Sequence, residues 1–123
     1  MGENSVSVDN VDNYLRISFK GNLVYGQTEE LKRTLIEKLE KKDGYIIDTT
    51  NVNDIDSTGF GVFVNTAKKV NSKKIAIIVN DEFIRELFEI AKFSMLFPIV
   101  QNLEEAKATL SGDVDNQLSI NDY

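Results

Sequence analysis

The sequence contains neither cysteine nor histidine. Without cysteine the chain can form no disulfide, zinc–thiolate site or thiol nucleophile. Without histidine it lacks the commonest general base, the usual nitrogen ligand of metals and the acceptor of a histidine phosphorelay. These absences argue against most hydrolases and metalloenzymes. We therefore expect no enzyme, no catalytic residue, no metal site and no cofactor.

Long apolar runs and clustered basic residues are also missing. No run approaches the roughly 20 apolar residues that a membrane span needs, and no charged and apolar leader opens the chain. The net charge is −6, and basic residues gather only in pairs such as Lys68 and Lys69. Nucleic-acid binding needs larger positive clusters. We expect a cytoplasmic protein that binds neither membranes nor nucleic acid.

The 123 residues, 41% of them apolar and 28% charged, are typical of one globular domain. The segment 112–123 contains three aspartates and no lysine or arginine. Its few large aliphatic residues cannot offset the loss of chain entropy on ordering. The sequence thus predicts a domain at 1–111 and a disordered acidic tail at 112–123.

Alternating and helical apolar patterns follow one another along the domain. A hairpin is predicted over residues 6–19 with its turn near 9–13. Thr28 is predicted to cap a helix that runs to Lys42 and is ended by Gly44. Strands at 45–50, 75–79 and 97–100 alternate with helices at 58–71, around 84–91 and at 102–110.

The order β-β-α-β-α-β-α-β-α predicts an α/β fold, with a mixed sheet of four or five strands packed with about four helices. Pro98 cannot donate a ladder hydrogen bond, so its strand is expected at an edge. Asn102 and Glu105 form a capping-box pattern at the last helix.

The segment NDIDSTGFG, residues 53–61, is expected to be a loop between a strand and a helix. Open α/β sheets bind ligands at this end, and helix amino termini attract anions. Calcium-loop spacing fails because glycine and glutamate are not at the required positions. A magnesium-dependent receiver site lacks its acidic pair, and Gly59-Phe60-Gly61 lacks the third glycine of a nucleotide loop. What remains is a helix cap at Asp56 or Ser57, or a phosphorylation switch.

The helix that follows has two distinct faces in the sequence. Phe60, Phe63, Val64 and Ala67 form one stripe, which should face the core. Val62 is predicted on the opposite, exposed face, with Thr58, Asn65 and Lys69. This face is either a partner surface or an ordinary surface with one exposed apolar residue.

Two glycines weaken the first turns of this helix. Gly59 and Gly61 each cost about 1 kcal/mol relative to alanine. Their presence indicates that another backbone approaches closely. The sequence leaves open whether that backbone belongs to a partner or to the chain's own sheet.

The segment DSTGFGVFVNTAKKV resembles the D-S-[ST]-G-[LF]-G-V motif of bacterial anti-sigma factor antagonists, which belong to the STAS domain family. RELFEIAKFSMLFPIV resembles a second family segment before the last strand, and the expected element order is similar from residue 5 to residue 110. The resemblance implies a STAS-like fold and phosphorylation of Ser57, with Thr58 as the rival acceptor. It implies an anti-sigma factor serine kinase as partner and a serine phosphatase acting on the phosphorylated form.

By this resemblance, the unphosphorylated chain would bind the anti-sigma factor and free a sigma factor. The expected contact residues are Asp56, Ser57, Thr58, Gly59, Val62, Asn65 and Lys69. A hydroxyl at a helix start is accessible, local amides can hold a phosphate, and a phosphate adds about −1.5 to −2 charges.

The sequence departs from the family pattern at three positions. Asn22 and Val24 stand where acidic residues are usual, and Lys92 replaces a glycine. The missing acidic residues at positions 22 and 24 leave the identity of the kinase open. Two other functions remain: a STAS module that scaffolds a phosphatase or kinase without a sigma factor, and a small nucleotide-binding domain.

Overall fold

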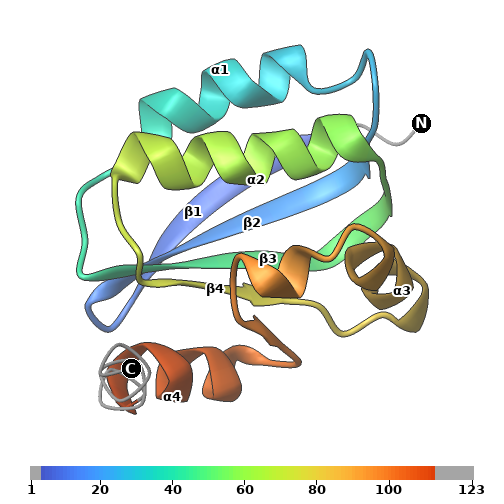
Figure 1. Cartoon of the computed structure of the whole chain (residues 1–123). Helices are drawn as coiled ribbons and strands as arrows, with labels where there is room; N and C mark the ends of the chain where they lie inside the picture. Colours follow the sequence, from blue (N-terminus) through green and yellow to red (C-terminus); the bar gives the residue numbers. More distant parts are fainter. Residues whose placement is uncertain (1–3, 113–123) are drawn as a thin grey trace.

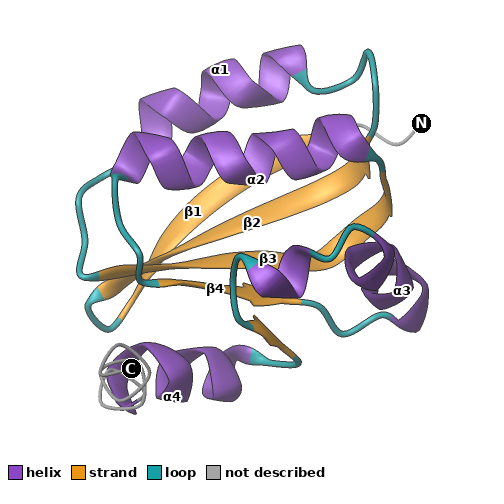
Figure 2. Ribbon diagram, viewed as in Figure 1, coloured by secondary structure: helices purple, strands orange, loops and turns teal. Residues whose placement is uncertain are grey.

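The computed structural model describes residues 4–112, and in it helices cover both faces of a five-stranded sheet (Figures 1 and 2). The predicted α/β class, the mixed sheet and the four helices are confirmed. In chain order the elements are β1 (Ser5–Val11), β2 (Tyr14–Leu23), α1 (Glu29–Lys38), β3 (Gly44–Ile55), α2 (Ser57–Val70), β4 (Ile75–Ile78), α3 (Glu82–Ile90), the 3-10 turn η1 (Phe93–Met95), β5 (Ile99–Val100) and α4 (Leu103–Gly112).

The strands lie in the order β1-β2-β3-β4-β5. β1 is antiparallel to β2 and forms the predicted hairpin, whereas the other neighbours are parallel. The parallel strands therefore all end at one edge of the sheet, where α1, α2 and α3 begin (Figure 1). The short β5 lies at the outer edge, as Pro98 predicted.

Side chains that alternate along the central strands form two cores. Tyr45, Ile47, Ile75 and Ile77 face α1, α2 and α3. Phe63 of α2 and Phe88 of α3 pack in the same core. Ile46, Ala76 and Ile78 face α4, where Ala106 and Leu110 cover them. A strand with apolar residues on both faces reads as a continuous apolar run, which is why these two strands were recognisable in the sequence.

The first helix ends earlier than the sequence predicted. α1 stops at Lys38, and Leu39 is already extended. The tyrosine hydroxyl of Tyr45 accepts from the amide of Lys42 and donates to the carbonyl of Glu40, which holds the following residues as a loop. Thr28 is the N-cap residue of α1, as predicted, and its carbonyl accepts from the amide of Lys32 at 2.9 Å, but its side chain caps no amide within residues 4–112. The predicted role of Gly44 is wrong, because Gly44 begins β3.

β3 is much longer than predicted. It continues from the expected strand to Ile55 and pairs with the distal half of β2, so the expected loop at 53–61 is strand up to Ile55 and helix from Ser57. Val52 and Ile55 are buried in it. Only Asp56 separates β3 from α2.

None of the helices in the described part of the chain is both long and apolar enough to cross a membrane. The predicted tail lies outside the described residues except for Gly112, which ends α4.

Candidate functional site

Asp56 links the end of β3 to the start of α2 and is the cap of that helix. Its Oδ1 accepts from the amide of Thr58 at 2.8 Å and from that of Gly59 at 3.4 Å. The carboxylate thus satisfies amides that a helix start would otherwise leave unpaired. Of the two cap candidates in the sequence, Asp56 is the one used, and Ser57 is the first residue of the helix.

The other oxygen of Asp56 reaches a different segment. Oδ2 accepts from the amide of Tyr25 at 3.0 Å, in the loop between β2 and α1. This bond is the largest cause of a lowered pKa at Asp56, and the amides of Thr58 and Gly59 lower the pKa further. Hydrogen bonds to the ionised carboxylate favour it over the neutral acid, so Asp56 is charged at neutral pH.

The loop that carries Tyr25 is held from its other side by Asn4. The Asn4 side chain donates to the carbonyls of Asn22 and Gln27, both at 2.8 Å, and accepts from the amide of Asn22. Gln27 also donates to the carbonyl of Val24 at 3.0 Å. Tyr25 is 85% exposed. A fixed loop therefore presents an aromatic side chain to solvent, beside the start of α2.

Ser57 and Thr58 differ in how freely their hydroxyls can react. Ser57 is exposed, and its hydroxyl makes no hydrogen bond to any residue within 4–112. Thr58 is only partly exposed, and its side chain contributes to the lowered pKa of Asp56. Of the two candidate acceptors, Ser57 has the more accessible hydroxyl.

The expectation that local amides hold a phosphate is not supported by this geometry. The amides of Thr58 and Gly59 already donate to Asp56, and the amide of Phe60 donates to the Asp56 carbonyl at 3.0 Å. A phosphate on Ser57 would have to displace the Asp56 carboxylate to reach them. Otherwise it projects from the surface beside a second negative charge.

The two glycines of α2 have different surroundings. A Cβ on Gly59 would lie 2.3 Å from the Leu23 carbonyl oxygen and 2.6 Å from the Ile55 side chain. Gly59 is thus buried and needed for packing of α2 on its own sheet. A Cβ on Gly61 would meet nothing within 4 Å, so the fold itself does not require that glycine.

Val62 is not exposed, which corrects its predicted position. It is only 2% exposed because α1 lies beside α2 and covers that face. Phe60 and Phe63 are buried as predicted, and Val64 and Ala67 pack against the same core. The helix is therefore buried on two sides, and the sequence pattern revealed only one of them.

Gly59 and Val62 are buried, and the other five predicted contact residues fall into two groups. Asp56, Ser57 and Thr58 gather at the start of α2, next to Tyr25. Asn65 and Lys69 lie on later turns and line a groove against α1. Ser57 and Lys69 are twelve residues apart, which is about 18 Å along a helix. Tyr25 was missed because an isolated tyrosine beside a glycine carries no sequence pattern.

Comparisons with known proteins identify a similar family and similar folds. The family model of the STAS domain matches residues 5–106. No curated protein matches the sequence significantly. An anti-sigma factor antagonist from Mycobacterium paratuberculosis has a similar structure, with a TM-score of 0.75 and 17% identity over 87% of this chain and 93% of that one.

Two further solved structures have the same fold. An anti-sigma factor antagonist (STAS) domain protein from Planctomyces limnophilus gives a TM-score of 0.73 and 15% identity, covering 88% of this chain and 99% of that one. The anti-sigma factor antagonist SpoIIAA in its unphosphorylated form gives a TM-score of 0.62 and 15% identity, covering 87% of this chain and 96% of that one. At these identities the likeness concerns the fold.

Proposed function

The chain belongs to the STAS domain family, and from this we propose that it is an anti-sigma factor antagonist that acts by binding and is not itself an enzyme. The unphosphorylated form binds an anti-sigma factor that is also a serine kinase, and a sigma factor is thereby released. The kinase phosphorylates Ser57, which ends the binding. A serine phosphatase restores the binding form.

The observation that carries this proposal is the accessible hydroxyl of Ser57 at the first residue of α2. It lies beside the charged Asp56, whose two carboxylate oxygens both accept hydrogen bonds, and near the exposed Tyr25 of the loop between β2 and α1. Similar folds support the same function: the anti-sigma factor antagonist SpoIIAA has a solved structure in its unphosphorylated form.

Charge is the proposed basis of the switch. A phosphate at Ser57 adds about −1.5 to −2 charges. Asp56 cannot neutralise them, and the nearest amides of α2 already donate to Asp56. The phosphorylated surface must therefore either desolvate this charge against the partner or move Asp56 away. Both consequences oppose the docking of the same partner.

Affinity capture from the native cell with three baits tests the proposal. Wild type and Ser57→Ala should retain a serine kinase of the anti-sigma factor class, and Ser57→Asp should retain much less of it. Because Asp56 is the cap, Ser57→Ala should change the free energy of unfolding by less than the ~0.5–2 kcal/mol of a lost cap. Equal capture by all three baits would contradict the switch.

The site of modification is tested separately. Incubation with the captured kinase and ATP, followed by fragment mass analysis, should place one phosphate on Ser57. Thr58→Ala is the matched control and should still be phosphorylated. Phosphate on Thr58 would overturn the assignment. Capture of a phosphatase without a kinase would favour the scaffold function, and the substitutions at Asn22 and Val24 would be its first explanation.

A further inference from the structure

An apolar groove runs between α1 and α2. Leu35 and Ile36 of α1 and Leu39 just after it line one side and Val62 lines the other, in a hollow of about 280 Å³. A second hollow of about 320 Å³ continues it towards the end of α2 and shares Ile36 and Leu39 with the first. Ile36 is 53% exposed. Leu35 and Val62 are buried at its floor, so Ile36 and the partly exposed Leu39 supply the apolar surface that stays open in the trough.

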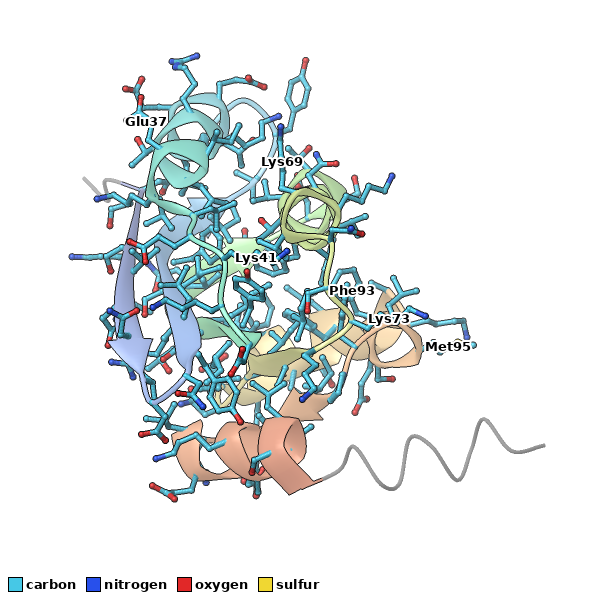
Figure 3. All side chains as sticks on the ribbon, turned by 90° about the vertical axis from the view of Figure 1, so that its left-hand side faces the viewer. Glu37, Lys41, Lys69, Lys73, Phe93 and Met95 are labelled. Carbon is cyan, nitrogen blue, oxygen red and sulfur yellow. The ribbon has the colours of Figure 1, made fainter. Side chains whose placement is uncertain are left out.

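The rim of this groove is positive although the chain is acidic overall. Lys32, Lys68 and Lys69 line the first hollow and Lys41 lines the second. Among the residues that the structure describes, Glu40 is the only acidic one that lines either hollow. Within residues 4–112, Lys32 pairs with Glu29 at 3.3 Å, while Lys41, Lys68 and Lys69 form no ion pair. Figure 3 shows Lys41 and Lys69 beside the space between the two helices, with Lys73 farther away.

The exposed face of α3 is negative, in contrast to the positive rim of the groove. Phe83 is 54% exposed and Ile90 is 77% exposed, and they lie seven residues apart on one stripe. Glu82, Glu86 and Glu89 flank them and are exposed. Arg85, the basic residue of this helix, is partly buried and lines the same surface as the three glutamates, while its guanidinium donates to the carbonyl of Val79. With three glutamates and one arginine, the outer surface of α3 is apolar and carries an excess of negative charge.

From these two surfaces we propose that the groove between α1 and α2 binds α3 of a second copy of this chain. An amphipathic helix laid in an apolar groove is a common mode of recognition. α3 has nine residues, about 13 Å of helix, and the groove follows α1 from Lys32 to its end at Lys38, about 9 Å. Phe83 and Ile90 enter the trough, and the three glutamates meet the lysine rim.

This contact joins two different surfaces, so it is head-to-tail. A bound pair leaves one groove on one copy and one α3 on the other free, so further copies can add. A single short helix buries less area than the about 800 Å² per partner of a standard interface. Dissociation constants on the order of 0.1–1 mM are therefore expected. The contact does not depend on phosphorylation of Ser57.

Sedimentation velocity of the full chain from about 10 µM to 1 mM tests the association. The weight-average sedimentation coefficient should rise with concentration for wild type. Ile36→Asp blocks the groove and Ile90→Asp blocks α3, and each should remain monomeric. Asn10→Asp adds the same charge on exposed β1 and should behave as wild type. For the rim, Lys69→Glu should weaken association, whereas Lys73→Glu should not.

Mixing the two blocked variants distinguishes contact between the groove and α3 from contact between two grooves or between two α3 helices. Ile36→Asp keeps a working α3 and Ile90→Asp keeps a working groove. The equimolar mixture should form a 1:1 dimer that grows no further. A wild type that stays monomeric, or a mixture that stays monomeric, would overturn the proposal.

Amide NMR of the full chain locates the contact. On dilution, the signals of Ile36, Val62 and Lys69 should shift together with those of Phe83, Glu86 and Ile90. Shifts confined to α3 would indicate contact between two copies of α3 and would overturn the proposal. Shifts confined to the groove would show that something other than α3 fills it and would also overturn the proposal.

Discussion

The carboxylate of Asp56 accepts hydrogen bonds from backbone amides of two separate segments, the first turn of α2 and the loop before α1. A single side chain thus fixes the position of Ser57 relative to Tyr25. Any charge added at Ser57 acts on this carboxylate first. The residue beside the modified serine is therefore the structural centre of the site.

The pH dependence of stability should reflect this carboxylate. The pKa of Asp56 is lowered in the folded chain, chiefly by the amide of Tyr25. Its contribution is therefore complete above the unfolded pKa of about 3.9 and is lost as the pH falls through the folded value. Asp56→Asn keeps a capping side chain and removes the charge.

The unfolding free energy of Asp56→Asn should fall less steeply than that of wild type below about pH 4, as measured by urea unfolding. The two proteins should therefore differ less at pH 2 than at pH 7. Parallel curves over this range would show that Asp56 contributes no pH dependence.

Tyr25 should act as an anchor for the partner. It is exposed, aromatic and held by its own backbone amide, and such residues often dominate binding energy. Tyr25→Ala should weaken binding of the captured anti-sigma factor by about tenfold or more. The unfolding free energy should change by no more than about 0.5 kcal/mol.

The matched control for Tyr25→Ala is Ile36→Ala, which truncates an exposed apolar residue on α1. It should leave anti-sigma factor binding unchanged in the same titration. A loss of stability in Tyr25→Ala that accounts for the weaker binding would remove the anchor role.

At the level of the helix, the two glycines of α2 form a natural pair for comparison. They lie two residues apart, with the same intrinsic cost in a helix. Only Gly59 faces the sheet closely, and Gly61 faces open space. Packing of the fold therefore explains the glycine at position 59, whereas no contact among the described residues explains the glycine at position 61.

Substitution by alanine should therefore act in opposite directions. Gly59→Ala should destabilise by about 1–3 kcal/mol because the new methyl group meets the Leu23 carbonyl. Gly61→Ala should stabilise by about 0.5–1 kcal/mol. Thermal and urea unfolding measure both. A destabilised Gly61→Ala would mean that this position is tighter than its surroundings indicate.

The elements that the sequence predicted well are those with one continuous apolar pattern. The runs at Ile75–Ile78 and in the first half of β3 are apolar on both faces, and the stripe of α3 repeats with helical spacing. The distal half of β3 was missed because Asn51, Asn53 and Asp54 favour turns. Pairing with β2 decides their conformation, and that pairing is not local in sequence.

The candidate site was predicted in part for the same reason. Ser57 and Asp56 are neighbours in a motif, so the sequence could indicate both. Tyr25 and Asn4 reach the site from 31 and 52 residues away from Asp56, and only the fold brings them near. The prediction that Val62 is exposed was wrong because its exposure depends on where α1 packs.

For the molecule as a whole, the described residues form two cores, one on each face of the sheet. Within residues 4–112, the large core lies beneath α1, α2 and α3 and the smaller one beneath α4, and their last buried residue is Leu110. The small core depends on α4 alone for its cover. Stability should therefore be sensitive to the loss of α4 and insensitive to residues beyond it.

Two truncations test this division. Deleting 113–123 should leave the melting temperature within a few degrees of the full chain. Ending the chain at Glu105 removes Ala106 and Leu110 and exposes Ile46 and Ile78 to water. Burial of one leucine contributes about 1.5–3 kcal/mol, and 1 kcal/mol corresponds to about 4–8 °C for a domain of this size. The shorter chain should therefore melt at least about 10 °C lower, by circular dichroism. A similar fall on deleting 113–123 alone would show that those residues stabilise the domain, contrary to the predicted boundary.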